Sequence, residues 1–361
     1  MFSRLSFKAL LVSALFGASS LSLAALQMEA IAEGLDTPWS VAELPEGGFL
    51  VTERPGSIKR VAPSGEMTAV TGVPEVFAKR QGGLFDVVLH PNFATNNTVF
   101  LAYAAGSEDS NQTTVARGVL DGSALTDVTV IFEVSPTKRG GGHFGGRMAF
   151  LADGTLLLSV GEGYTLREDA QKTGSQLGKL LRMTETGEAP ADNPFQDAPY
   201  VYSYGHRNPQ GLIVDAATQS IWMTEHGPKG GDELNRIGAG KNYGWPAITY
   251  GVDYSGAIIS PFTEAPGMEQ PVTYWVPSIA TSGLALYTGL AIPSLTGKLL
   301  VGALKAKKVV AVDVSGEKPV LSEPFPDLEA RVRDVRALSD GSIAVIDEAG
   351  GKVIRVSQGA D

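Results

Sequence analysis

Six times along the chain, a short apolar run is followed by a turn and then by a second short apolar run. Runs of this kind, bounded by Gly, Pro and polar turn residues, are typical of paired β-strands. A unit that recurs about every 55 residues matches the blade of a β-propeller that carries insertions. We therefore predict an all-β fold, a six-bladed β-propeller. The paired runs are 48–53 with 56–61, 99–103 with 115–119, 154–160 with 179–183, 221–225 with 233–237, 298–303 with 309–314, and 342–347 with 352–356.

The repeat predicts one domain. A chain of 361 residues would ordinarily suggest two domains, but a propeller takes up such a length in a single ring. The run 26–32 is placed to pair with the last blade and close the ring. A pair of β-sandwiches is the alternative that the same strands allow. The third and fourth units are the most expanded, and long insertions on one face of a repeat fold usually carry the binding site.

Residues 1–24 have the composition of a cleavable signal peptide. Arg4 and Lys8 precede the uncharged apolar run 9–16, and Ser22 and Ala24 place small residues where a signal peptidase cleaves. The apolar run is short for a membrane span, so we predict no stable membrane insertion, with an N-terminal anchor as the alternative. We expect the mature chain, residues 25–361, to be a single propeller domain in the periplasm or secreted.

Charge and missing motifs exclude several classes of function. The net charge of −10 lacks the basic footprint of a nucleic-acid-binding protein. The chain contains no Cys, which excludes disulfides and thiolate chemistry. It has no HExxH zinc motif, no Gly-x-Ser-x-Gly nucleophile elbow and no Walker A loop. No glycine-rich stretch follows the strand–GxGxxG–helix pattern of a nicotinamide-binding unit.

His143 is one of four histidines and lies in the stretch 140–146, Gly-Gly-Gly-His-Phe-Gly-Gly. Glycines let the backbone approach a ligand closely, and none of them blocks access to the imidazole. A His with a near-neutral pKa can accept a proton from a substrate hydroxyl. We therefore consider His143 a candidate general base. The alternative is a surface-loop His whose glycines serve the turns.

Two polar segments near the fourth unit are suited to binding anions or cations. Arg207 beside Asn208 offers a guanidinium fork and an amide, which suit carboxylates or quinone carbonyls. The alternative is a structural turn around a buried Arg. The segment 224–233 mixes carboxylates with Gly and Pro, whose backbone carbonyls can point inward, and such oxygens suit calcium. It lacks the EF-hand spacing, so a solvated acidic loop is the alternative.

Three cations in the last part of the chain form another candidate site. Lys305 follows an apolar run, and Arg331 and Arg333 are two residues apart. In an extended segment these two arginines point to the same side. Two cations on one face repel unless an anion or an acid lies between them, and a polycarboxylate ligand would fit. A solvated basic edge strand is the alternative.

Six motifs in order resemble one family. They are Gln-Gly-Gly-Leu-Phe-Asp-Val at 81–87, His-Phe-Gly-Gly-Arg at 143–147, Tyr-Gly-His-Arg-Asn-Pro-Gln-Gly at 204–211, Glu-His-Gly-Pro-Lys-Gly-Gly-Asp-Glu-Leu-Asn at 225–235, Gly-Lys-Asn-Tyr-Gly-Trp-Pro at 240–246 and Arg-Val-Arg-Asp-Val at 331–335. Together they resemble the soluble aldose sugar dehydrogenases that depend on pyrroloquinoline quinone (PQQ), relatives of soluble quinoprotein glucose dehydrogenase. The resemblance covers nearly all of the mature chain. It implies a six-bladed propeller that oxidises the anomeric carbon of aldoses to lactones by hydride transfer to PQQ, with His143 as general base.

The resemblance also implies which residues bind. Positions that match cofactor-holding residues are Gln81, Arg207, Asn208, Tyr254, Lys305, Arg331 and Arg333. The carbonyls of Gly227 and Pro228 match ligands of a cofactor-bound calcium ion, while Glu233 and the backbone of Tyr243 match a second calcium site. Positive side chains in this set suit the three carboxylates of PQQ. The implied partners are an aldose substrate and an electron acceptor that the sequence does not identify.

Two places depart from the relatives. In the glucose dehydrogenase branch an Asp precedes the base, whereas Gly142 precedes it here, which favours the aldose branch over a strictly glucose-tuned enzyme. The stretch 161–164, Gly-Glu-Gly-Tyr, differs from the Gly-Asp-Arg type common in relatives, so substrate contacts near it cannot be carried over.

Two other functions are possible for such a propeller, a calcium-dependent hydrolase of the lactonase type and a non-catalytic binding protein. A lactonase needs a cluster of carboxylates and Asn around its metal, and it has no use for Lys305, Arg331 and Arg333. A binding propeller has no use for His143.

Overall fold

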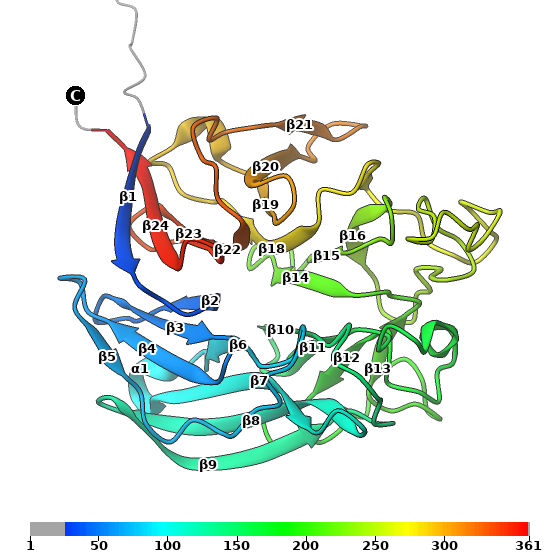
Figure 1. Cartoon of the computed structure of the whole chain (residues 1–361), viewed down its shortest axis with the longest axis horizontal. Coiled ribbons are helices and arrows are strands. Elements are labelled where there is room, and N and C mark those ends of the chain that lie inside the picture. The colour runs from blue at the N-terminus through cyan, green and yellow to red at the C-terminus, as the bar shows by residue number, and fades with distance from the viewer. Residues whose placement is uncertain (1–25, 360–361) are drawn as a thin grey trace, which may run out of the picture.

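Six four-stranded antiparallel sheets are arranged in a ring, which confirms the predicted six-bladed propeller (Figure 1). The structure is a computed structural model that describes residues 26–359, so the predicted signal peptide lies outside the described residues. The innermost strands of the six sheets, β2, β6, β10, β14, β18 and β22, surround the centre of the ring. No helix in residues 26–359 is long and apolar enough to span a membrane.

Each blade is listed from its innermost strand outward. Blade 1 is β2 (Pro38–Glu43), β3 (Phe49–Glu53), β4 (Ser57–Val61) and β5 (Met67–Ala69). Blade 2 is β6 (Leu84–Leu89), β7 (Thr98–Gly106), β8 (Asn111–Asp121) and β9 (Ala124–Glu133). Blade 3 is β10 (Gly145–Phe150), β11 (Leu156–Val160), β12 (Lys179–Met183) and β13 (Val201–Tyr204).

Blade 4 is β14 (Pro209–Val214), β15 (Ile221–Glu225), β16 (Asp232–Ile237) and β17 (Thr273–Trp275). Blade 5 is β18 (Thr281–Leu286), β19 (Leu299–Ala303), β20 (Lys308–Asp313) and β21 (Val320–Ser322). Blade 6 is β22 (Val332–Ala337), β23 (Ile343–Asp347), β24 (Lys352–Gln358) and β1 (Leu26–Glu33). The described helices are short: α1 (Phe93–Asn96) and two 3₁₀ turns, Arg167–Gln171 and Pro293–Leu295.

The ring is closed by the two ends of the described chain. Strand β1 pairs antiparallel with β24, with Leu26 opposite Gln358, so the first strand completes the last blade. Figure 1 shows β1 in blue beside β24 in red. This is the closure that the run 26–32 predicts. Because the first strand lies in the last sheet, the backbone hydrogen bonds of β24 are satisfied and the ring is held shut.

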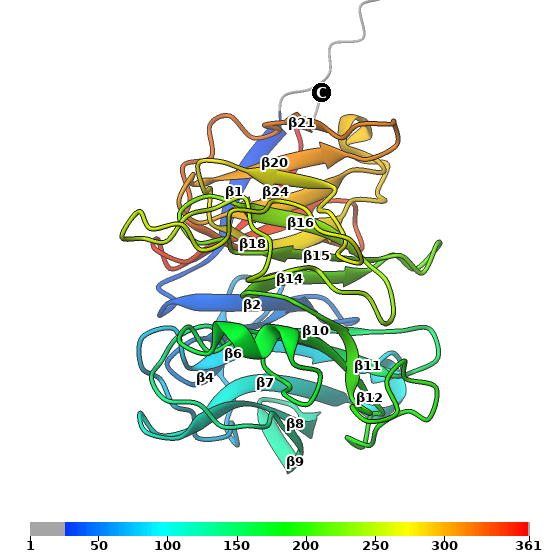
Figure 2. The same ribbon diagram turned by 90° about the vertical axis from the view of Figure 1, so that its right-hand side faces the viewer.

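The insertions lie mainly in blades 3 and 4, as predicted. Loops 161–178 and 184–200 extend blade 3, and loop 238–272 separates β16 from β17 in blade 4. These loops gather on one side of the ring, at the right of Figure 1, and they face the viewer in Figure 2.

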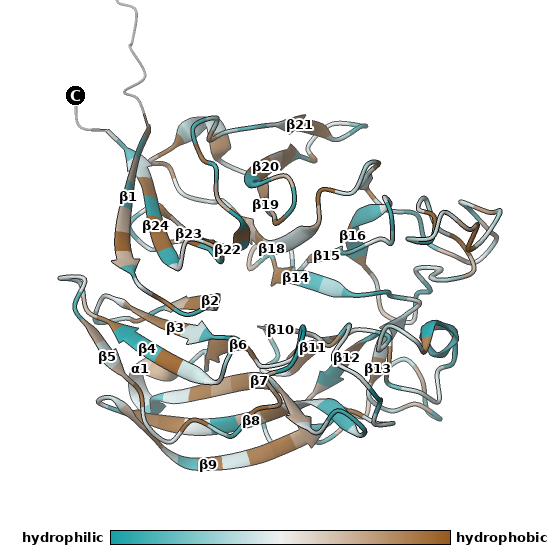
Figure 3. Ribbon diagram, viewed as in Figure 1, coloured by the Kyte–Doolittle hydropathy of each residue, from teal (hydrophilic) through white to brown (hydrophobic). Residues whose placement is uncertain are grey.

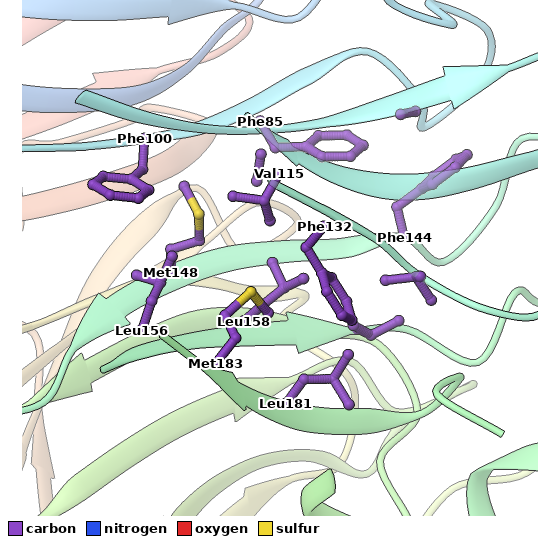
Figure 4. Packing of buried hydrophobic residues seen from close by; sticks show 14 of the residues in the cluster. Phe85, Phe100, Val115, Phe132, Phe144, Met148, Leu156, Leu158, Leu181 and Met183 are labelled. Carbon is purple, nitrogen blue, oxygen red and sulfur yellow. The ribbon is translucent and has the colours of Figure 1, made fainter. Parts of the chain in front are cut away.

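Apolar side chains between neighbouring sheets form the core. Brown, hydrophobic segments run along the strands of each blade in Figure 3. Between blades 2 and 3, Phe85, Phe132, Phe144 and Met148 converge in one cluster (Figure 4). The rings of Trp39 and Phe85 lie 5.4 Å apart, which connects this cluster to blade 1. Full burial of a side chain of this size contributes about 1.5–3 kcal/mol, so the blades are fastened face to face.

A buried ionic cluster joins the inner strands across the centre of the ring. Nη1 of Arg147 lies 3.4 Å from Asp86 and 3.1 Å from Asp334, and its guanidinium stacks 4.0 Å from the Trp39 ring. Arg336 completes the cluster, 3.1 Å from Asp86 and 2.9 Å from Asp334. Arg147 also donates to the backbone carbonyls of residues 210 and 333. Two cations balance two anions, and the contacts of this cluster hold together five of the six blades, all except blade 5.

Candidate functional site

A cavity of about 570 Å³ opens where the inner strands begin. Its lining residues come from all six blades of the ring, and its charged members are four arginines and one acid. The lining residues are Thr37, Trp39, Arg54, Arg80, Gln81, Phe85, Phe144, Gly145, Asn208, Gln210, His226, Leu304, Arg331, Arg333, Glu348 and Ala349. This excess of positive charge favours an anionic ligand.

Arg331 and Arg333 point to the same side, as their spacing predicts. The acid between them is Glu348, whose carboxylate lies 2.5 Å from Nε of Arg331 and 2.7 Å from Nη2 of Arg333. Burial would raise the pKa of Glu348, but the charges of Arg333 and Arg331 outweigh burial and lower it. Arg333 lies on the inner strand of blade 6 and Arg331 directly precedes that strand, so both face the centre of the ring, where Glu348 pairs with them. Glu348 neutralises one of the two charges and leaves the other for a ligand.

Four of the five remaining predicted cofactor residues are divided between two cavities. Gln81 and Asn208 line the 570 Å³ cavity. Arg207 and Tyr254 line a second cavity of about 310 Å³, together with Glu162, Tyr164, Thr165, Arg167, Pro228, Trp245, Asp253 and Ile259. Lys305 is exposed and lines neither cavity, although the residue before it, Leu304, lines the first. Arg207 is buried and donates to the backbone carbonyls of His226 and Gly227, at 3.0 and 2.7 Å.

His143 is held on both sides in a left-handed conformation with φ = 48°. Its backbone N–H donates to Oε1 of Gln81 at 2.8 Å, and its ring Nδ1 lies 3.0 Å from Oε1 of Glu162. A carboxylate only accepts, so Nδ1 carries the proton and donates to it. Nε2 is then the ring nitrogen with a free lone pair, which is the requirement for a base.

The surroundings of His143 lower the pKa of its imidazole, which favours the neutral form. Burial lowers its pKa below the ordinary value of 6.5, and the positive charges of Arg207 and Lys138 lower it further, while Glu162 acts in the opposite direction. Lys138 is a site residue that sequence reasoning missed. Its ammonium donates to Oδ1 of Asn111 at 2.9 Å and to the carbonyl of residue 140 at 3.1 Å, and it lies 3.5 Å from the Phe144 ring. Burial lowers the pKa of Lys138 to about 7.

The same His–Glu arrangement recurs one blade further along. His206 precedes the inner strand of blade 4, and its Nδ1 lies 3.0 Å from Glu225, again 19 residues later. Its Nε2 is taken by the hydroxyl of Ser203 at 2.8 Å, and all three side chains are buried. The resulting chain of three groups has the residue types of a hydrolase triad, but the imidazole has no exposure to a substrate. His206 therefore orients Glu225, whose other oxygen accepts from the backbone N–H of Arg207 at 2.6 Å.

Two carboxylates of blade 4 face each other across neighbouring strands. Glu225 on β15 is directly opposite Glu233 on β16. Burial and the charge of Glu225 raise the pKa of Glu233 to about 8. Both residues line a small cavity of about 10 Å³, which is also lined by Gly227 and Tyr243. Like charges at directly opposed positions destabilise a sheet unless a proton or a cation lies between them.

Buried polar atoms without a partner gather around these cavities. Within residues 26–359, nine buried side-chain atoms lack a hydrogen-bond partner. Five of them belong to residues that line the three cavities just described: Arg54 Nε, Glu162 Oε2, Arg207 Nε, His226 Nε2 and Trp245 Nε1. Each such atom costs free energy unless a ligand, an ion or water satisfies it. Their concentration here makes this region the candidate ligand site.

Comparison with known proteins places the chain among sugar dehydrogenases. Residues 35–355 match the family model described as Glucose / Sorbosone dehydrogenase. Aldose sugar dehydrogenase YliI of Escherichia coli is 41% identical over 347 residues, covering 92% of this chain and 93% of that protein. Quinoprotein glucose dehydrogenase B of Acinetobacter calcoaceticus is 28% identical over 326 residues, covering 81% and 67%. The PQQ-bound form of an aldose sugar dehydrogenase from Streptomyces coelicolor superposes with a TM-score of 0.77 at 29% identity, covering 92% and 98%.

Proposed function

The chain belongs to the glucose/sorbosone dehydrogenase family of oxidoreductases, and from this premise we propose that it oxidises the anomeric carbon of aldoses to lactones, with PQQ as its cofactor and His143 as general base. The observation that carries this proposal is the hydrogen-bonded His143–Glu162 pair, directly followed in the chain by Phe144 and Gly145, which line the cavity with four arginines. A base beside an anion-binding cavity is what a hydride transfer to an anionic quinone requires.

The first cavity fits the cofactor chemically. PQQ carries three carboxylates, and the cavity offers Arg54, Arg80, Arg331 and Arg333 against the single acid Glu348. The amides of Gln81, Asn208 and Gln210 add neutral donors, and Nε2 of His226 is buried without a partner. When bound, the quinone supplies the two-electron acceptor for the hydride. Lys305 would reach the cofactor only from the rim, because Leu304 occupies the adjoining position in the wall.

The proton is handled by the chain itself. Nε2 of His143 accepts the proton of the anomeric hydroxyl while the C–H bond of that carbon delivers its hydride. The resulting imidazolium is stabilised by the Glu162 carboxylate, 3.0 Å from Nδ1. Burial of both side chains excludes water from this pair, which strengthens their interaction.

For calcium, the two proposed positions differ in their support. Glu233 and Tyr243 line the 10 Å³ cavity together with the opposed Glu225, and Asn235, whose amide donates to both carboxylates, has an unpartnered Oδ1. Hard oxygen ligands with excess negative charge suit calcium. At the other position, the Gly227 carbonyl already accepts from Arg207, so calcium on Gly227 and Pro228 would have to share that carbonyl with the guanidinium. Within residues 26–359, no three acidic or His side chains converge on a metal position, so carbonyls would have to complete either site.

Replacement of Glu233 by Gln tests the calcium proposal. In calcium-free buffer above pH 8, where Glu233 is ionised, we expect Glu233→Gln to unfold at a higher temperature than the wild type, because the repulsion from Glu225 is removed. Calcium should raise the unfolding temperature of the wild type and should no longer raise that of Glu233→Gln. Thermal unfolding with chelator and with calcium measures both effects, and Glu264→Gln, on the exposed part of the insertion, is the matched control. An equal response to calcium in both proteins would contradict the assignment.

Location and partners complete the proposal. The predicted signal peptide supports a periplasmic or secreted enzyme, with an aldose as substrate and an electron acceptor that reoxidises the cofactor. The cationic cavity disfavours a hydrolase of the lactonase type, which has no use for Arg331 and Arg333.

Reconstitution tests the function directly. Purified apoprotein is mixed with PQQ and calcium, passed through a desalting column, and assayed for dye reduction with several aldoses. We expect retained quinone absorbance and sugar-dependent dye reduction. Absence of both with every sugar would overturn the proposal, and quinone retention without turnover would leave a binding protein.

A further inference from the structure

Tyr164 is held in a conformation that an aromatic residue rarely adopts. Its φ is +72°, in the left-handed region, and it follows Gly163, whose φ is +82°. Such conformations persist only where the surroundings enforce them, and they gather at functional sites. The two successive left-handed residues turn the chain so that Tyr164 lies against His143, the proposed general base.

The ring of Tyr164 packs against the imidazole of His143. The two ring centroids are 5.0 Å apart at an angle of 76°, an edge-to-face contact. Nevertheless 49% of Tyr164 is exposed, and the side chain forms a wall of the 310 Å³ cavity. Apart from its contact with His143, the aromatic surface of Tyr164 is open. Neither the proton transfer nor the cofactor cavity uses this surface.

Gly142 provides the space for this arrangement. A Cβ at position 142 would lie 3.0 Å from Cβ of Tyr164, closer than nearly all real Cβ contacts. A side chain at position 142 would therefore displace Tyr164 by a few tenths of an ångström from its present contact with His143. The φ of Gly142 is not in the left-handed region, so the glycine is needed for space and not for backbone conformation.

The cavity beside Tyr164 has the groups that recognise a sugar. It combines the aromatic surfaces of Tyr164, Tyr254 and Trp245 with the charged hydrogen-bonding groups of Arg167 and Asp253. The C–H faces of a pyranose pack on aromatic rings, and its hydroxyls pair with charged donors and acceptors. Glu162 is part of the same wall and its carboxylate is hydrogen-bonded to His143, so a sugar in this cavity lies beside the His143–Glu162 pair.

We propose that Tyr164 binds the aldose substrate, and that the pairing of Tyr164 with Gly142 determines which aldoses the site accepts. The inference rests on the proposed function, because it identifies the sugar-binding residue of that same site. Tyr164 acts as a binding wall, and the large open ring gives broad contact with sugars that differ in the orientation of single hydroxyls.

The test compares Tyr164→Ala with Tyr164→Phe, which keeps the ring. KM and kcat are measured for a panel of aldoses, and direct binding of the same aldoses to cofactor-free protein is measured by calorimetry. In Tyr164→Ala we expect KM and the sugar Kd to rise by about tenfold, the effect of losing one aromatic contact, with kcat at saturation and PQQ affinity little changed. Tyr164→Phe should stay within about threefold of the wild type, since the ring is retained.

Gly142→Ala tests the pairing, with Gly174→Ala as control because a Cβ at position 174 meets nothing within 4 Å. As a single substitution, Gly142→Ala should raise KM. In a protein that already carries Tyr164→Ala it should not raise KM further, since the crowded ring is absent there. Additive effects would overturn the pairing.

The possible outcomes separate this inference from the proposed function. Unchanged KM and Kd in Tyr164→Ala, in an enzyme that oxidises aldoses, would overturn the inference and leave the function standing. A loss of kcat with unchanged KM would overturn it too, because Tyr164 would then only position His143. Sugar binding that depends on Tyr164 without any oxidation would support the inference and refute the function.

Discussion

Replacement of His143 by Ala is expected to lower kcat for aldose oxidation by about 10³-fold, the usual contribution of a positioned general base. PQQ affinity should remain close to that of the wild type, because His143 does not line the 570 Å³ cavity. Dye reduction gives kcat, and quinone absorbance after desalting gives cofactor retention. His90→Ala is the matched control, since His90 lies in blade 2 and pairs with Glu185 outside the site.

The pH dependence of the wild type sharpens this prediction. The pKa of His143 lies below 6.5 because burial and the charges of Arg207 and Lys138 outweigh Glu162. The base must be neutral to act, so activity should persist below pH 6.5 and fall only as pH drops through the lowered pKa. Loss of cofactor together with activity in His143→Ala would instead make His143 a structural residue. A fall in activity toward low pH that is centred above pH 6.5 would contradict a lowered pKa of His143.

The sequence predicts the second and third strands of every blade but not the first. Strands such as β11 and β19 are buried along their whole length, so they are continuous apolar runs. The inner strands face the crowded centre of the ring and carry Gly, Arg and Asp, as in β10, Gly-Gly-Arg-Met-Ala-Phe. Side chains of this kind have neither an apolar run nor a clean alternation, so no strand signal stands out.

The residues of the candidate site can be predicted only in part from the sequence, for a related reason. Arg331 and Arg333 have a local spacing that predicts their common side, whereas Arg54 and Arg80 reach the same cavity only because the ring brings blades 1, 2 and 6 together. Glu162 could have been found, because its spacing of 19 residues from His143 is repeated by Glu225 and His206. A search for recurring His–Glu spacings between blades would have identified it.

The same convergence creates the ionic cluster at the centre of the ring, and it gives the largest expected effect on stability. Arg147→Met keeps most of the side-chain volume over Trp39, but among residues 26–359 it leaves Asp86 and Asp334 with Arg336 as their only paired cation. Breaking a buried ion pair by removing one partner costs about 3–5 kcal/mol, because a buried charge is left uncompensated. We expect the free energy of unfolding to fall by about that amount, measured by urea denaturation with an unchanged m-value.

A second variant distinguishes lost charge balance from lost packing. Adding Asp334→Asn to Arg147→Met removes the uncompensated carboxylate, so the double variant should recover part of the stability that the single variant loses. Arg139→Met is the control, since the Arg139–Asp109 pair is fully at the surface, with side chains 80% and 78% exposed. Pairs of this kind contribute little. If Arg147→Met were no less stable than Arg139→Met, the cluster would not be what holds the inner strands together, and the apolar contacts between the sheets would have to do so alone.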